Sequence, residues 1–266
     1  MTTLDTLRTL LWRFYADFFM PSRLGEYEAL LAGIKSIGYV TLTATEFWHA
    51  INNDSLPSLT LILRHDVDTS PVTARKQWEI ENRLGVKSTF YFRWLTTEPG
   101  LMKEIEASGS EVGYHYEEVS DFAKQHHIRQ AEAIMARLET IKELFAYNLF
   151  RFRSISGLPV RTVAAHGDFV NRKLNVFNTV ILENDSELRK RSSILFEAYD
   201  QAVMAKVTSR LSDHPPPYFW RPQSPMEALS SNPKLLYLLL HCRHWLCRPY
   251  DNLRSDWQRL LEGLIW

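Results

Sequence analysis

The stretch from Leu59 to Asp68, LTLILRHDVD, constrains the fold more than any other part of the chain. Its first residues are apolar and rich in Leu and Ile, which is typical of a strand buried on both faces of a parallel sheet. It closes with His65, Asp66 and Asp68, and strands of this kind carry their chemistry at the carboxyl end. Because residues i and i+2 of a strand point the same way, we expect Asp66 and Asp68 to face one pocket.

Two carboxylates held close together repel each other, so this pair requires an explanation. A metal ion bound by one carboxylate, with the other acting as a base, would remove the repulsion. A solvated acidic loop after an ordinary strand would also explain the pair. The motif by itself leaves both interpretations open.

Composition excludes some classes of protein. Of the 266 residues, 45% are hydrophobic and 23% are charged, as in a globular protein with a core. Lysine plus arginine equals aspartate plus glutamate at 31 each, so there is no broad electrostatic case for nucleic acid as a partner. No apolar stretch is long enough to span a bilayer, so we expect no transmembrane segment. The chain shows none of the features of a signal peptide, and we expect a cytoplasmic protein.

The N-terminal segment, about residues 1–22, has the pattern of an amphipathic helical extension. We expect it to dock on the core; interfacial membrane contact through Trp12, Phe14, Phe18 and Phe19 is the alternative. No internal repeat or low-complexity linker divides the chain, so residues 1–266 are expected to form a single domain. The sequence leaves the oligomeric state undetermined.

Helical and strand patterns alternate along the chain, which predicts an α/β fold whose parallel sheet is open or closed into a barrel. The predicted strands are residues 39–42, 59–68, 87–92, 111–114, 162–165 and 235–240. The predicted helices are residues 24–37, about 43–51, 72–84, 99–108, 127–148 and 256–264. Residues 175–181 and 196–208 are further candidates for strands.

Several predicted strands end in a histidine or an aspartate. Besides Asp66 and Asp68, the strand ends carry His115, His166 and His241. Because the carboxyl ends of parallel strands meet at one edge, these side chains are expected to build one site. Histidine and aspartate are suitable ligands for a zinc-like ion, which activates water beside a carboxylate base. A histidine opposite would protonate the leaving group.

Four segments together resemble the polysaccharide deacetylases with NodB homology, most closely the subgroup with a D-x-D motif. They are RHDVD, STFYF, EVGYHYE and a closing LLLH, and the resemblance extends over about residues 24–245. It implies a distorted (β/α) barrel of the polysaccharide deacetylase type, a divalent metal that we expect to be zinc, and hydrolysis of acetyl groups on sugars. Together with the expected location, it points to an intracellular glycan precursor as substrate, such as a nucleotide-linked or lipid-linked sugar.

The family's functional residues carry over by motif. Asp66 is similar to the catalytic base, and Asp68 is similar to the metal-binding aspartate. His115 matches the first histidine of the metal motif, and His241 matches the late histidine that acts as the acid. Asp213 resembles the acid that orients this histidine, although the segment after it is longer than in the usual pattern.

The chain departs from the family at the third metal ligand. The usual second histidine would stand four residues after His115, where this sequence has Val119. Valine cannot bind a metal. We predict that His166 replaces it, because His166 follows another predicted strand. Glu118 and Glu117 are the alternative ligands.

A second departure concerns the arginine that steers the base in the family. Arg151 and Arg153, in the segment FRFRS, are the candidates for it. These departures leave open a function of another class, a catalytically degenerate deacetylase-like protein that binds carbohydrate or assists assembly. Stoichiometric metal in the purified protein would distinguish the enzyme from this alternative.

The motif segments are also rich in tryptophan. Trp94, Trp220 and Trp245 follow or flank them, where they would stack on a sugar ring or pack as part of the core and rim. The sequence favours packing.

Both cysteines lie near the C-terminus. Cys242 and Cys247, with His241 and His244 close by, would allow a local zinc site. Their spacing matches no established zinc motif, and a single pair argues against a disulfide framework.

Overall fold

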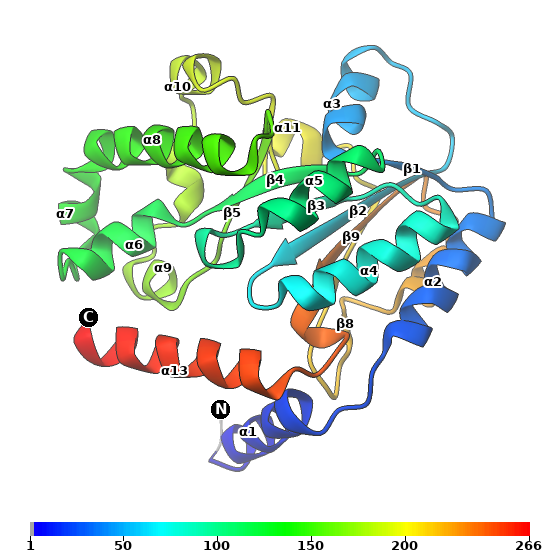
Figure 1. Cartoon of the computed structure of the whole chain (residues 1–266), viewed down its shortest axis with the longest axis horizontal. Helices are drawn as coiled ribbons and strands as arrows, with labels where there is room; N and C mark the ends of the chain where they lie inside the picture. The colour runs from blue at the N-terminus through cyan, green and yellow to red at the C-terminus, as the bar shows by residue number, and fades with distance from the viewer. Residues whose placement is uncertain (1–2) are drawn as a thin grey trace.

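The computed structural model describes residues 3–266, with side chains described from residue 8 onward. Within this range a nine-stranded, mainly parallel sheet lies at the centre of the molecule (Figure 1). The strands are β1 (Val40–Leu42), β2 (Thr60–Val67), β3 (Thr89–Phe92), β4 (Glu111–Tyr116), β5 (Thr162–Ala165), β6 (Phe196–Glu197), β7 (Ser209–Asp213), β8 (Trp220–Arg221) and β9 (Leu235–His241).

Helices connect most of these strands, as the alternating pattern predicts. They are α1 (Thr3–Phe18), α2 (Leu24–Ser36), α3 (Ala44–Asn52), α4 (Pro71–Leu84), α5 (Pro99–Ala107), α6 (Glu118–Gln125), α7 (Ala131–Met135), α8 (Leu138–Ser156), α9 (Phe169–Leu174), α10 (Ser186–Arg191), α11 (Gln201–Met204), α12 (Pro225–Leu229) and α13 (Pro249–Ile265). Local signals set their ends: the Ser70 hydroxyl accepts a hydrogen bond from the Thr73 amide and caps α4, and Gly85 ends this helix in the left-handed region at φ 62°.

The strand order is β6-β5-β4-β3-β2-β9-β7-β8, and β1 also pairs with β2. Every pairing is parallel except that of β7 with β8. The prediction of an α/β fold with a parallel sheet is therefore confirmed. Main-chain pairing between the described strands does not join β6 to β8, so the ladder itself is open.

The sheet is strongly curved, and its concave face brings distant strands together. One hydrophobic cluster on this face includes Ile62 of β2, Phe196 of β6 and Tyr237 of β9. On a flat sheet β2 and β6 would lie about 19 Å apart, at about 4.8 Å per strand. Arg64 of β2 nevertheless donates a 3.2 Å hydrogen bond to the hydroxyl of Tyr199, just beyond β6.

The convex face is covered by helices. One hydrophobic cluster packs α2 and α4 against β2 and β9, and a larger one packs α5, α6 and α8 against β3, β4 and β5. The carboxyl end of β2 points towards the side where α13 lies (Figure 1).

Some boundaries differ from those predicted. The single helix expected at residues 127–148 is two helices, α7 and α8, and α8 continues to Ser156, where Gly157 ends it at φ 70°. Residues 175–181 contain a short 3₁₀ helix (Asn178–Ile181) in place of a strand. Strand β7 escaped the sequence pattern because it contains one apolar residue, Leu211.

Helices are also predicted at both ends of the chain. α1 lies within the segment for which a helical extension is expected, and the first two residues of that segment lie outside the described residues. α13 is longer than the predicted helix at residues 256–264. In the described part of the chain, no helix combines the length and the hydropathy that crossing a bilayer requires.

Candidate active site

Strand register places the predicted site residues on the concave face at two neighbouring levels, because the residue of β4 that is level with Asp66 is Gly113, two residues before His115. Across the β2–β9 ladder Asp66 is paired with His241, and across the β4–β5 ladder His115 is paired with Ala164. His166 follows β5 directly, and its amide continues the ladder to Tyr116. Since paired residues of neighbouring parallel strands point to the same face, Asp66, His115 and His241 face the same space.

A glycine makes room next to His115 on the concave face. Gly113 lies two residues before His115 and therefore on the same face of β4. A Cβ atom at this position would lie 2.3 Å from the ring of Tyr91 on β3. The ring of Tyr91 thus fills the space that a side chain at position 113 would take, next to His115 on the concave face.

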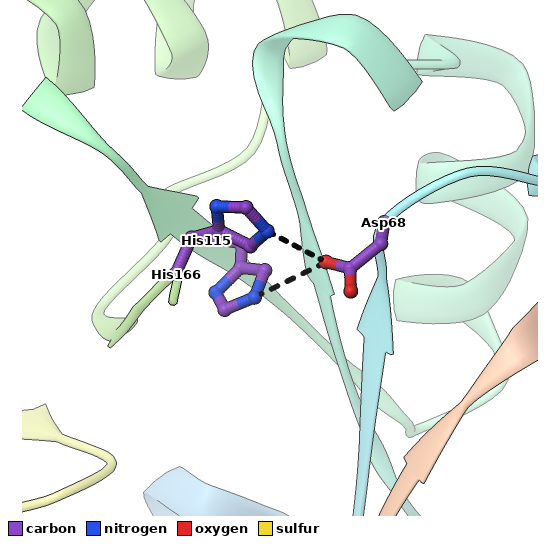
Figure 2. A group of neighbouring side chains, drawn as sticks. All are labelled: Asp68, His115 and His166. Atoms are coloured by element: carbon purple, nitrogen blue, oxygen red, sulfur yellow. Dashed lines mark ion pairs between the residues drawn. The ribbon is translucent and has the colours of Figure 1, made fainter. Parts of the chain in front are cut away.

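Asp68, His115 and His166 converge at the carboxyl ends of β2, β4 and β5 (Figure 2). The Oδ1 atom of Asp68 lies 3.4 Å from Nε2 of His115 and 3.6 Å from Nε2 of His166. One potential ligand atom from each residue lies within 4.8 Å of the others. Ligands about 2.1 Å from one tetrahedral ion are about 3.4 Å apart, so this spacing suits zinc.

The surroundings of the three side chains also fit a metal ion. Asp68 Oδ1 is buried without a hydrogen-bond partner among the described residues. His115 Nδ1 lies 2.8 Å from the carbonyl oxygen of Ala164, which places the proton of a neutral ring on Nδ1 and leaves the Nε2 lone pair facing Asp68. His166 Nδ1 lies 3.2 Å from a carboxylate oxygen of Glu117 without forming a hydrogen bond to it, and a carboxylate is a usual neighbour of a ligating histidine.

Protonation of the three groups is set by burial and by their neighbours. Burial would raise the pKa of Asp68, but the charges of His166 and His115 hold it well below its usual range. Burial and the nearby Arg93 lower the pKa of His166, so this ring is neutral at neutral pH. Burial lowers the pKa of His115, but Asp66 and Asp68 outweigh it and raise the pKa, so a proton competes with a metal there.

Neither alternative third ligand belongs to this cluster. Glu117 accepts hydrogen bonds from the guanidinium of Arg93, the shortest at 2.6 Å, and supports His166 from behind. Glu118 is buried and accepts a 2.6 Å hydrogen bond from the hydroxyl of Tyr114. Both glutamates therefore have structural partners, which the sequence did not reveal.

Asp66 is held by an arginine from its own strand. Arg64 Nε donates to Asp66 Oδ1 at 2.7 Å, and Nη2 donates to Oδ2 at 2.9 Å. Both side chains are buried, so this bidentate pair is shielded from solvent. Burial would raise the pKa of Asp66, but the charge of Arg64 outweighs it and lowers the pKa. Asp66 is therefore anionic at neutral pH.

The expectation that Arg151 or Arg153 steers this base is wrong. Arg153 donates to the carbonyl oxygen of Val160, and the Arg151 guanidinium lies 5.1 Å from the centre of a Trp94 ring. Both arginines lie on α8, on the convex side of the sheet. The signal that would have identified Arg64 is its position two residues before Asp66 in a strand, which puts both on one face.

His241 and Asp213 form a second hydrogen-bonded unit at the end of β9. His241 Nδ1 lies 2.8 Å from Asp213 Oδ1, while the His241 amide and the indole of Trp245 each donate to Oδ2 at 2.8 Å. Burial would lower the pKa of His241, but the charge of Asp213 raises it to about 9. His241 is therefore an imidazolium at neutral pH, oriented by Asp213.

His244 joins this unit, and its Nδ1 lies 3.2 Å from Asp213 Oδ1. Asp213, His241 and His244 also satisfy the spacing of a metal site. Both oxygens of Asp213 are already engaged by hydrogen bonds, so this group is better described as an oriented acid. The local zinc site with cysteines does not form: Cys247 donates to a main-chain carbonyl, and neither group of metal-competent spacing among the described residues contains a cysteine.

Tryptophan packing excludes one proposed sugar contact. Trp245 is 1% exposed, lies against Tyr27 at 5.1 Å between ring centres, and bonds to Asp213. Trp220 packs edge-on against Trp245. Trp245 therefore belongs to the core, as the sequence favoured, and is closed to a ligand.

A cavity of about 110 Å³ joins the two halves of the site. Asp68 and Thr69 line it on one side, His241 and His244 line it on the other, and Arg259 of α13 completes its rim. A small polar group held in this cavity would contact the metal-competent cluster and the imidazolium together.

No protein-family model and no curated protein matches the chain. Among solved structures, IcaB from Ammonifex degensii superposes with a TM-score of 0.43 and 17% sequence identity. The alignment covers 59% of this chain and 75% of that chain. At so low a TM-score the likeness carries no inference about activity.

Proposed function

We propose that the protein is a metal-dependent hydrolase that removes an acetyl or similar acyl group from a carbohydrate. One observation carries the proposal: Asp68 clusters with His115 and His166 and lines the same cavity as the imidazolium His241. The buried anion Asp66 lies beside this cluster, with its Oδ2 atom 3.4 Å from Nε2 of His115. A structural ion pair alone would not require two histidine nitrogens aimed at an unbonded carboxylate oxygen.

Asp68, His115 and His166 would hold the ion, which we propose to be zinc. Such an ion supplies two kinds of chemistry: it activates a water molecule and it polarises the acyl oxygen. The donor set of one carboxylate and two imidazoles leaves a coordination position free, as catalytic zinc sites require. Glu117 and the Ala164 carbonyl orient the two imidazoles from behind.

Proton transfer falls to Asp66 and His241. Asp66 takes a proton from the attacking water, and the guanidinium of Arg64 keeps this carboxylate fixed and ionised beforehand. His241 gives its proton to the departing amine or alcohol, and Asp213 keeps the imidazolium oriented and its pKa at about 9. Each transfer of this type contributes roughly 10²–10⁴-fold to the rate.

The curved sheet supports the same assignment of family. We interpret it as the distorted barrel of a polysaccharide deacetylase, with a seam between β6 and the edge formed by β7 and β8. Tyr199, just beyond β6, lies at this seam with the Arg210 guanidinium of β7 5.3 Å from its ring centre. Together with the motifs RHDVD and EVGYHYE, this favours an acetylated carbohydrate as the substrate. We propose a glycan precursor, such as a nucleotide-linked or lipid-linked sugar, from the expected location of the protein and not from the motifs.

Release of acetate tests the proposal. Purified protein, stripped of metal and then supplied with zinc, should release acetate from at least one member of a panel of N-acetylated sugars, nucleotide sugars and lipid-linked sugars. The stripped protein should be inactive. Sugar binding without acetate release across the panel, in a protein that holds no metal, would replace the enzyme with the carbohydrate-binding alternative.

A further inference from the structure

Exposed apolar side chains are concentrated at one place on the molecule. Of the 23 large hydrophobic side chains exposed in the described part of the chain, 12 lie on α1, on α13, or on Phe19 directly after α1. A soluble surface rarely gathers so many in one area unless it meets a partner. The two helices lie together on one side of the molecule (Figure 1), and Arg13 of α1 pairs with Asp256 of α13 at 2.7 Å.

Helix α13 exposes apolar side chains and buries polar ones. Tyr250, Trp257 and Leu264 repeat every seven residues and form one stripe, with exposed fractions of 74%, 59% and 73%. Asn252 and Ser255, which are polar, are the residues that this helix buries. A helix stabilised only by packing on its own protein shows the opposite arrangement.

Helix α1, which lies beside α13, also exposes apolar side chains and buries a charged one. Leu10 and Phe14, one turn apart, are 58% and 56% exposed. Asp17 is 5% exposed and pairs with Arg243 at 2.7 Å. We call the outward apolar surface of Leu10, Phe14, Tyr250, Trp257 and Leu264 the α1–α13 face.

The charged side chains next to this face that have no ion pair are basic. Among side chains described from residue 8 onward, each acid of the two helices is paired with a basic side chain. These acids are Asp17, Asp251, Asp256 and Glu262. Arg8 and Arg254 are exposed, and neither has an ion pair or a hydrogen bond within the described residues. Arg254 follows Tyr250 by one turn, so it lies at the apolar stripe itself.

We infer that the α1–α13 face docks on the surface of an anionic lipid bilayer. Apolar and aromatic side chains beside arginines are the composition of helices that lie in a membrane interface, where the cations meet lipid phosphates. A second copy of the chain fits less well, because two such faces would bring unpaired arginines together without an acid between them. The docking does not depend on the proposed reaction.

Docking would also orient the site. Arg259 lies about half a turn around α13 from the apolar stripe and lines the cavity that contains Asp68 and His241. α13 therefore separates the bilayer from the opening of the site by the width of one helix, which is about 10 Å. Glycans carried at a membrane surface would lie within reach of this cavity.

Vesicle flotation tests the inference with the full chain. Wild-type protein should float with vesicles of phosphatidylcholine mixed with phosphatidylglycerol, less with phosphatidylcholine alone, and less at high salt. The double variant Trp257→Ser/Leu264→Ser should lose binding by at least about tenfold per side chain. Arg8→Gln/Arg254→Gln should weaken binding by roughly fivefold per arginine on the anionic vesicles.

A matched control uses apolar side chains exposed elsewhere. Phe150 and Ile155 on α8 are 66% and 47% exposed, and Phe150→Ser/Ile155→Ser should bind vesicles like the wild type. Absence of vesicle binding by the wild type, or equal loss in both double variants, overturns the inference. So does a dimer in analytical ultracentrifugation that Trp257→Ser/Leu264→Ser abolishes while vesicles are never bound. Acetate release from a water-soluble sugar, measured separately, tests the proposed reaction and should be unchanged in every one of these variants.

Discussion

Two neighbouring residues of β2, His65 and Asp66, belong to clusters of similar composition on opposite faces of the sheet. On the convex face, His65 Nε2 lies 2.7 Å from Glu81 Oε1, and Tyr27 donates to the same oxygen. On the concave face, Asp66 lies beside the cluster of Asp68, His115 and His166. Each cluster combines buried histidine with carboxylate, so residue type alone does not distinguish them.

The two clusters differ in their solvent accessibility and in what the Nε2 atoms of their histidines face. His65, Glu81 and Tyr27 are 0% exposed, and the ring of Phe90 is stacked on His65 at 4.2 Å. The Nε2 atom of His65 is therefore engaged by the Glu81 carboxylate in a space closed to solvent. On the other face, Asp68 keeps 19% of its side chain exposed and lines a cavity. The comparison favours a structural role for the first cluster and shows that the second is open to a ligand through Asp68.

The largest expected effect comes from Asp68→Ala. It removes the carboxylate that faces both imidazoles, so metal affinity should fall by more than about 100-fold, beyond the loss that outer partners cause. Turnover should fall with it. Elemental analysis of the purified variant measures the metal, and circular dichroism should show an intact fold. Stoichiometric zinc in this variant would remove Asp68 from the ligand set.

Asp66→Asn should keep the metal and lose the reaction. Asparagine fills the same space beside Arg64 but cannot accept a proton, so turnover should fall by roughly 10²–10⁴-fold. Acetate release and zinc content are measured on the same sample. Undiminished turnover would show that another group is the base.

Glu81→Ala should have the reverse effect on the convex cluster. It leaves His65, Tyr27 and Ser88 buried without the carboxylate that they contact, so the free energy of unfolding should fall by about 2–5 kcal/mol. Zinc bound per folded molecule should not change. Urea unfolding and elemental analysis measure the two quantities, and a variant as stable as the wild type but depleted in zinc would invert the assignment of the two clusters.

Asp213→Asn should shift the alkaline limb of the pH dependence of turnover. Because the pKa of His241 is about 9 in the folded protein and its ordinary value is 6.5, the protonated ring persists well above neutral pH. The pair therefore stabilises the fold fully below about pH 6.5, and this stabilisation is lost as pH rises through about 9. In the variant, the alkaline limb of turnover should shift to lower pH, and thermal unfolding should lose the same dependence. An unshifted limb would remove His241 as the acid.

Prediction from sequence succeeded where a local pattern determines geometry. The apolar run of β2 and the alternation of a strand place Asp66 and Asp68 on one face, and a histidine at the end of β4 or directly after β5 must lie at the same edge. The position of His166 beside Asp68 and His115 could be predicted in this way, although only the folded chain shows that Glu117 and Glu118 are engaged elsewhere. Arg64 was overlooked although the same alternation contained the signal.

What the sequence by itself determined is the alternation of the main strands and helices and the edge at which the polar residues gather, because both follow from periodicities of two and 3.6 residues. Tertiary structure decided what no local pattern contains. The curvature that brings Arg64 to Tyr199, the engagement of His65 by Glu81, and the outward stripe of α13 each depend on contacts between residues distant in the chain. Such contacts are set by how whole faces pack, and burial then decides which polar groups become structural and which remain free to bind.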